Sequence, residues 1–129
     1  LILGGVDDAV AAYSGQVGGF ESSPSKKRLI GLENAGHLAF SDLCNLGADK
    51  GGLVEIATQY GVTGASFASF LWDGCDEGQL PFEAARDIVN YSTTVVLKET
   101  LHCDASRVNL LPDIATKFEA VFEYREALE

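Results

Sequence analysis

Two short segments of the sequence contain side chains that could transfer a proton. VDDAV contains Asp7 and Asp8 and follows the apolar run LILGG, while NAGHLAFSDLC contains His37, one of two histidines, and follows RLIGLE. Apolar runs that stop at a turn are typical of buried strands, and functional groups of open α/β sheets gather where such strands end. We therefore expect the acid and the imidazole to meet on neighbouring turns.

This combination suits the activation of a nucleophile. A carboxylate against one imidazole nitrogen fixes the tautomer and stabilises the imidazolium that forms when the other nitrogen takes a proton. Asp8 is the preferred acid and Asp7 is the alternative. The structural alternatives are that Asp8 caps a helix beginning in AVAAY and that His37 only bonds backbone groups of its loop.

The elements that would position these groups are two short strands, predicted over residues 1–5 and 28–33. Residues 9–20 predict a short helix between them, and strand, helix and strand in this order are typical of a parallel sheet. Parallel strands need neighbours on their edges and helices on both faces. The predicted fold class is therefore α/β, the last two core strands plus helices of a doubly wound sheet, incomplete as a stand-alone domain.

The remainder predicts mainly helices. Residues 34–50 form a loop in this interpretation, and residues 52–61 have helical spacing. A longer helix is predicted over 81–101, where Pro81 suits the first turn and an apolar stripe runs through Phe82, Ala85, Ile88, Val89, Ser92, Val95, Val96 and Leu101. The tail contains another amphipathic segment, although VFEYR could equally be extended.

The segments LILGGVDDAV and KRLIGLENAGHLAFSD resemble the C-terminal part of the α/β-hydrolase superfamily, in which the triad follows the chain order serine, acid, histidine. The turn GHLAFSDLC is most similar to the bacterial secreted branch of dienelactone-hydrolase, platelet-activating-factor-acetylhydrolase and polyester-hydrolase-like enzymes. The resemblance divides a single domain into a strand, acid, strand and histidine part (1–44), a loop or insert (45–80) and C-terminal helices (81–129).

The resemblance implies a carboxylic-ester hydrolase in which Asp8 is the triad acid and His37 the general base. It implies a small-molecule or polymeric ester as substrate and neither a metal nor an organic cofactor. However, Gly-x-Ser-x-Gly is absent from the sequence, and the nearest segment, TGASFAS around Ser66, lacks the second glycine and follows the histidine. We therefore expect the serine on the upstream part of the hydrolase or on a complementary chain, and the isolated chain to be inactive.

The sequence also fits two other functions. One is a non-catalytic hydrolase-like binding module that has the acid and the base but no nucleophile. The other is an unrelated enzyme on an α/β sheet, because a fold alone does not determine chemistry. Four apolar residues could line an acyl pocket, although core packing is the simpler expectation: Phe67, Phe70, Leu71 and Trp72.

Charge and hydropathy exclude several partners. The formal net charge of −10 over 129 residues opposes binding to nucleic acid and to anionic membranes. No apolar run approaches the roughly 20 residues of a membrane span, and the N-terminus lacks the features of a signal peptide.

Two further polar residues have structural explanations. Asp42 suits hydrogen bonding to backbone groups of its turn. His102 suits the C-terminus of the predicted long helix, where a positive charge is favourable.

The three cysteines favour one disulfide and one free thiol. Cys44 and Cys75 lie in Gly- and Asp-rich segments where a covalent link would be useful, which leaves Cys103 unpaired. This pairing predicts an oxidising compartment and a secreted or periplasmic protein, whereas three free thiols would fit the cytosol. The irregular spacing makes a zinc site that includes His37 a weak alternative.

Overall fold

A computed structural model of the chain describes residues 1–46, 48–64, 73–102 and 111–129. Its centre is a three-stranded mixed sheet in the order β1-β2-β3. The first two strands, β1 (Ile2–Gly5) and β2 (Lys27–Leu32), pair in parallel, and β3 (Val121–Ala127) pairs antiparallel with β2. The segment VFEYR is therefore extended, which was one of the two alternatives for the tail, and part of the predicted C-terminal helical region is a strand.

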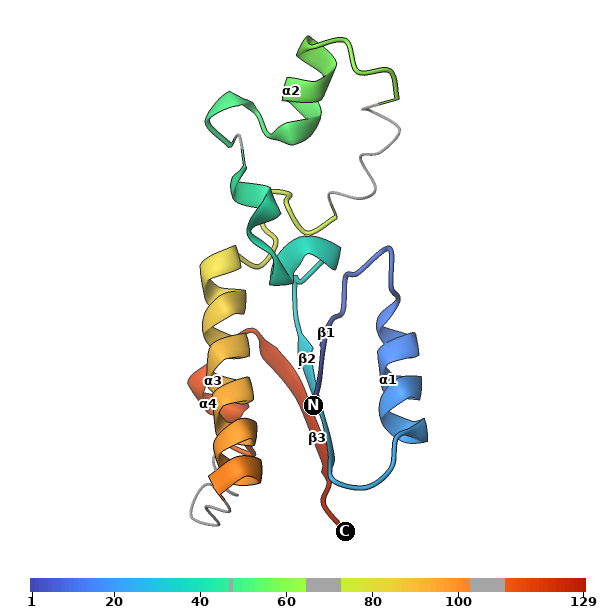
Figure 1. Ribbon diagram of the computed structural model, residues 1–129, viewed down its shortest axis with the longest axis vertical. Coiled ribbons are helices and arrows are strands. Elements are labelled where there is room, and N and C mark those ends of the chain that lie inside the picture. Colours follow the sequence, from blue (N-terminus) through green and yellow to red (C-terminus); the bar gives the residue numbers. More distant parts are fainter. Residues whose placement is uncertain (47, 65–72, 103–110) are drawn as a thin grey trace.

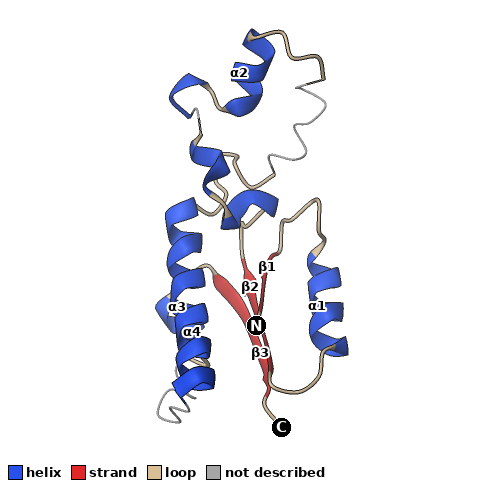
Figure 2. Ribbon diagram, viewed as in Figure 1, coloured by secondary structure: helices blue, strands red, loops and turns tan. Residues whose placement is uncertain are grey.

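Helices cover both faces of this sheet. The crossover helix α1 (Tyr13–Ser22) lies on one face, and α3 (Phe82–His102) and α4 (Ile114–Lys117) lie on the other (Figure 1, Figure 2). The crossover helix begins later than the sequence predicts. The carboxylate of Asp8 accepts hydrogen bonds from the N–H groups of Val10 and Ala11, and these bonds hold the preceding residues in a turn.

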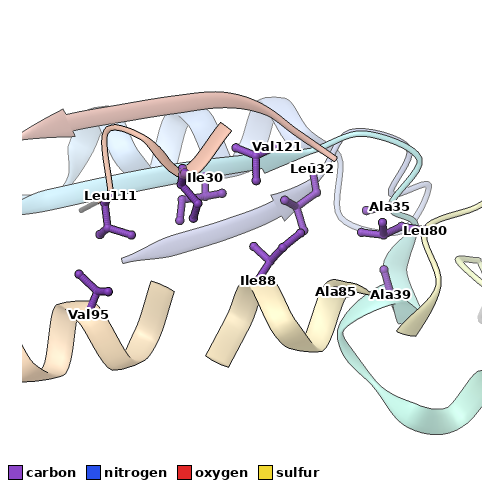
Figure 3. Packing of buried hydrophobic residues seen from close by; sticks show 11 residues of the cluster. Ile30, Leu32, Ala35, Ala39, Leu80, Ala85, Ile88, Val95, Leu111 and Val121 are labelled. Carbon is purple, nitrogen blue, oxygen red and sulfur yellow. The ribbon is translucent and has the colours of Figure 1, made fainter. Parts of the chain in front are cut away.

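The hydrophobic core fills the space between the sheet and α3. Ala85, Ile88 and Val95 from the predicted helix stripe are buried in one cluster with residues of β2, and Figure 3 shows the side chain of Ile88 next to Leu32. Ser92 is also fully buried, and its hydroxyl donates to the carbonyl of Ile88 at 2.8 Å. Leu101, the last member of the predicted stripe, is 71% exposed and lies outside the core.

The predicted loop after β2 contains short helical turns. Three 3-10 turns, η1 (His37–Phe40), η2 (Asp42–Asn45) and η3 (Ala48–Lys50), precede α2 (Leu53–Gln59). Figure 1 shows α2 beyond the carboxyl ends of β1 and β2, away from the sheet. Among the helices within the described ranges, none combines the length and apolar character that a bilayer span requires.

Candidate active site

The acid and histidine turns meet because their strands are parallel and in register. Gly5 at the end of β1 pairs with Leu32 at the end of β2, so the chain leaves both strands at one edge of the sheet. Backbone hydrogen bonds continue beyond the strands, from Val6 N–H to the Leu32 carbonyl at 3.0 Å and from Asp7 N–H to the Ala35 carbonyl at 3.2 Å. A Cβ atom at Gly5 would lie 2.0 Å from the Ala35 oxygen, so only glycine permits this approach.

At this edge, the carboxylate of Asp8 faces the imidazole of His37. The ring nitrogen Nδ1 lies 3.2 Å from Oδ1 and 3.1 Å from Oδ2 of Asp8. The Asp8 side chain is 6% exposed and the His37 side chain 37% exposed. Because an ionised carboxylate can only accept hydrogen bonds, Nδ1 carries the proton and the neutral imidazole has its acceptor at Nε2. No group within the described residues bonds to Nε2.

The surroundings of Asp8 favour its ionised form. Burial raises the pKa of the Asp8 carboxyl, but hydrogen bonds from Ala11 N–H, the His37 ring and Val10 N–H together bring the pKa below its ordinary value. The backbone bonds are 2.6 Å from Ala11 and 2.9 Å from Val10. Asp8 therefore holds its own turn and faces the histidine, but it does not cap α1, whose N-cap is Ala12 with no side-chain hydrogen bond.

Asp7, the alternative acid, is placed differently. Its side chain is exposed, and no described contact joins it to His37. The two aspartates are adjacent in the chain, so the turn that buries Asp8 at 9% exposure leaves its neighbour facing outward. Of the two candidates, the fold brings Asp8 to the imidazole.

A third carboxylate, which the sequence did not reveal, joins the two turns. Asp73 Oδ2 accepts a hydrogen bond from Ala9 N–H at 2.9 Å and another from His37 N–H at 2.8 Å. The Asp73 carbonyl also accepts from Leu38 N–H at 2.7 Å. The only sequence signal was that Asp73 belongs to the turn-forming segment DGCDEG, which indicates a turn but not what the turn contacts.

The Asp73 loop is covalently tied to the histidine loop. Cys44 and Cys75 form a disulfide across 31 positions of sequence, as the sequence analysis expected. This bond removes both cysteines as ligands of a metal beside His37. Within the described ranges, no group of three or more histidine, cysteine, aspartate or glutamate side chains is placed to hold a metal ion.

The other candidate residues either lie away from the pair of Asp8 and His37 or fall outside the described structure. Asp42, which was expected to bond backbone groups, begins η2, where the hydroxyl of the preceding Ser41 accepts a hydrogen bond from Leu43 N–H. His102 ends α3, and its side chain is outside the described part of the structure. The remaining candidates lie outside the described residues: Ser66, Phe67, Phe70, Leu71, Trp72 and Cys103.

No protein-family model matches the chain, and no curated protein and no solved structure is significantly similar to it.

Proposed function

We propose that this chain supplies the acid and the general base of a serine-type carboxylic-ester hydrolase. The proposal depends on one observation, the contact between the buried Asp8 carboxylate and His37 Nδ1 at 3.1–3.2 Å, with Nε2 on the opposite edge of the half-exposed ring. This is the arrangement that general-base activation of a hydroxyl requires. The serine is proposed to come from the upstream part of the same hydrolase or from a complementary chain.

The reaction proposed for this site is acyl transfer through a covalent intermediate. The serine oxygen would bond to the ester carbonyl carbon while its proton passes to His37 Nε2, and Asp8 would stabilise the resulting imidazolium. His37 would then return the proton to the leaving alkoxide as the carbon–oxygen bond breaks, which releases the alcohol and leaves an acyl-serine. The oxygen of a water molecule would then bond to the acyl carbon while its proton passes to His37 Nε2, and the histidine would return that proton to the serine oxygen as the acyl–oxygen bond breaks and the carboxylic acid leaves.

The surroundings of the pair suit an ester with an apolar part. Val6 and Val10 flank the two aspartates, and Phe40 and Leu43 follow the histidine; all four are exposed in the described structure. We propose that these side chains contact the apolar part of the ester, because exposed apolar surface beside polar groups occurs at ligand-binding sites. Both a small-molecule ester and a polyester fit this description.

The disulfide supports a proposal about localisation. Disulfides persist in oxidising compartments and are rare in the cytosol. Since Cys44 and Cys75 are joined in this structure, we propose that the hydrolase is secreted or periplasmic.

The decisive experiment uses the hydrolase in which this chain is combined with its serine-bearing part. We expect His37→Ala to lower turnover of a short p-nitrophenyl ester by roughly 10⁴-fold. The matched control is His102→Ala, which removes the other histidine and should leave turnover unchanged. Near-normal turnover of the His37 variant would refute the assignment of the base.

Two further measurements separate the proposal from its alternatives. Asp8→Asn should lower turnover far more than Asp7→Asn, because only Asp8 contacts the imidazole. A fluorophosphonate probe should label one serine of the combined protein. An unlabelled protein that turns over no ester would instead favour a non-catalytic binding module.

A further inference from the structure

One oxygen atom of Asp73 is bonded to both turns of the proposed active site. Oδ2 accepts from the N–H of Ala9, the residue after the acid, at 2.9 Å and from the N–H of His37 itself at 2.8 Å. Asp73 is 64 positions from the first donor and 36 from the second. Because both bonds end at the same atom, the separation of the two donor nitrogens cannot exceed the combined length of the bonds.

The two hydrogen bonds to Asp73 fix the backbone at His37 and next to Asp8, and this backbone sets the orientation of the two side chains. His37 is the first residue of η1, and Gly36 before it has no side chain that could accept its N–H. An unpaired N–H at the start of a helical turn needs an acceptor, and Asp73 provides one from a distant part of the chain. On the other side, Ala9 lies directly after Asp8, so its bond fixes the backbone from which the Asp8 carboxylate extends.

The contact between acid and base is sensitive to small displacements. The distances of 3.1 and 3.2 Å from His37 Nδ1 to Asp8 lie at the long end of the hydrogen-bond range. A relative movement of the two turns by a fraction of an ångström would therefore break the contact. Catalytic pairs must be held to within about 0.5 Å by the groups around them.

The segment that contains Asp73 is held in place by contacts of Asp73 and of the two residues that follow it. Its carbonyl accepts from Leu38 N–H at 2.7 Å, the backbone of Gly74 lies against Gly36, and Cys75 is joined to Cys44 by the disulfide. The carboxylate therefore projects from a segment that cannot move independently of the histidine turn. A charged acceptor also forms stronger hydrogen bonds than a neutral one.

From these contacts, we propose that Asp73 is a positioning residue that aligns Asp8 with His37. The hydrogen bonds of its carboxylate to the described residues come from the backbones of the two turns, so it acts through the pair and not on the substrate. The effect on ester hydrolysis rests on the function proposed above, whereas the alignment of Asp8 and His37 can be measured independently of any reaction.

The primary test follows the pair by NMR in the full chain. Asp73→Ala should abolish the low-field resonance of the His37 Nδ1 proton and give the Asp8 carboxyl a higher pKa than in Asp73→Asn, which removes the same charge. Asp73→Asn keeps an oxygen that can accept both bonds without the charge, so we expect it to retain the resonance of the His37 Nδ1 proton. The matched control is Asp76→Ala, which removes an exposed carboxylate from the same loop and should change neither signal.

The outcomes distinguish positioning from a merely structural role. A folded Asp73→Ala variant that keeps the low-field resonance of the His37 Nδ1 proton would overturn the proposal. If that variant does not fold, Asp73→Ser decides, because its shorter side chain cannot reach both donors: loss of the low-field resonance of the His37 Nδ1 proton supports the proposal, and an unchanged resonance refutes it.

A second measurement connects the alignment to catalysis. In the hydrolase that includes the serine-bearing part, Asp73→Ala should lower kcat by about 10²-fold and change KM little, because misplacement of the base affects the chemical step. A fall in kcat with the NMR signals of the pair intact would contradict positioning. If the combined protein hydrolyses no ester at all, the proposed function fails while the NMR experiment still tests the role of Asp73.

Discussion

Gly36 and Gly74 touch through their backbones at the base of the candidate site. A Cβ atom added to Gly36 would lie 2.4 Å from the nitrogen and 2.6 Å from the Cα of Gly74. The reciprocal Cβ on Gly74 would lie 2.9 Å from Leu38 N, and Gly74 has a φ of +105°, which side chains rarely adopt. The loop of Asp73 can therefore reach the histidine turn only because both contact positions lack side chains.

Gly36→Ala should separate these two loops. The atoms that the new methyl group would meet belong to backbone and cannot rotate away, so we expect the free energy of unfolding to fall by about 1–3 kcal/mol. The His37 N–H should also lose its acceptor and exchange faster with solvent. Denaturant unfolding and amide hydrogen exchange measure the two effects.

Gly15→Ala is the matched control for that variant. Gly15 lies in α1, and an added Cβ would meet nothing within 4 Å. Alanine is the better helix former, so this substitution should raise the free energy of unfolding by about 0.5–1 kcal/mol. Equal destabilisation by both substitutions would show that the contact of Gly36 with Gly74 has no special importance.

Loss of the disulfide should loosen the same junction. The bond closes a loop across 31 positions of sequence, for which chain entropy predicts a stabilisation of about 3–4 kcal/mol. We expect the double variant Cys44→Ala with Cys75→Ala to unfold at lower denaturant concentration. Hydrogen exchange should accelerate first at His37 and Leu38, whose N–H groups bond to Asp73.

The disulfide between Cys44 and Cys75 can be tested directly in the unsubstituted protein. Peptide mapping without reductant should recover Cys44 and Cys75 in one linked peptide. Alkylation of both thiols before reduction would contradict the structure and would remove the argument for an oxidising compartment.

The two strands and the pair at their ends could be predicted from the sequence because the signals are local. LILGG and RLIGLE are apolar and stop at turns, and parallel strands bring their ends to one edge of a sheet. The sequence favours Asp8 over Asp7 as the acid, and the structure places Asp8 against His37. The catalytic roles of the two residues stay predictions.

The Asp73 contacts could not be predicted because they depend on tertiary structure. Nothing in the spacing of Asp73 indicates that its carboxylate bonds to amides 36 and 64 positions away. The later start of α1 has a similar cause, because Asp8 uses the N–H groups of Val10 and Ala11 in a turn. For β3, the strand-like residues of VFEYR competed with an amphipathic pattern, and pairing with β2 decided the outcome.

Tyr13→Phe should weaken the link between α1 and β3. The Tyr13 hydroxyl donates to Glu123 Oε2 at 2.6 Å, and this bond is the main reason why the pKa of Glu123 is below its ordinary value. Phenylalanine keeps the ring contact with Phe122 but leaves Glu123 without that donor. We expect a loss of about 1.5–3 kcal/mol in the free energy of unfolding and a rise in the pKa of Glu123.

Urea unfolding and carboxyl NMR titration test the Tyr13 variant. The control is Tyr60→Phe, because Tyr60 is 84% exposed and the loss of its hydroxyl should cost nothing measurable. An unchanged titration of Glu123 in the Tyr13 variant would argue against the hydrogen bond.

Asp8→Asn should remove part of the sensitivity of the fold to acid. The pKa of Asp8 is lower in the folded chain than the ordinary 3.8, so protonation costs more free energy in the folded state than in the unfolded state. The stabilisation from Asp8 is therefore complete above about pH 3.8 and is lost as the pH falls through the lower folded value. Urea unfolding between about pH 5 and pH 2 should show a shallower decline for Asp8→Asn, whereas the exposed Asp7→Asn should decline like the unchanged protein. Parallel curves for both variants would mean that the hydrogen bonds to Asp8 do not stabilise its charge.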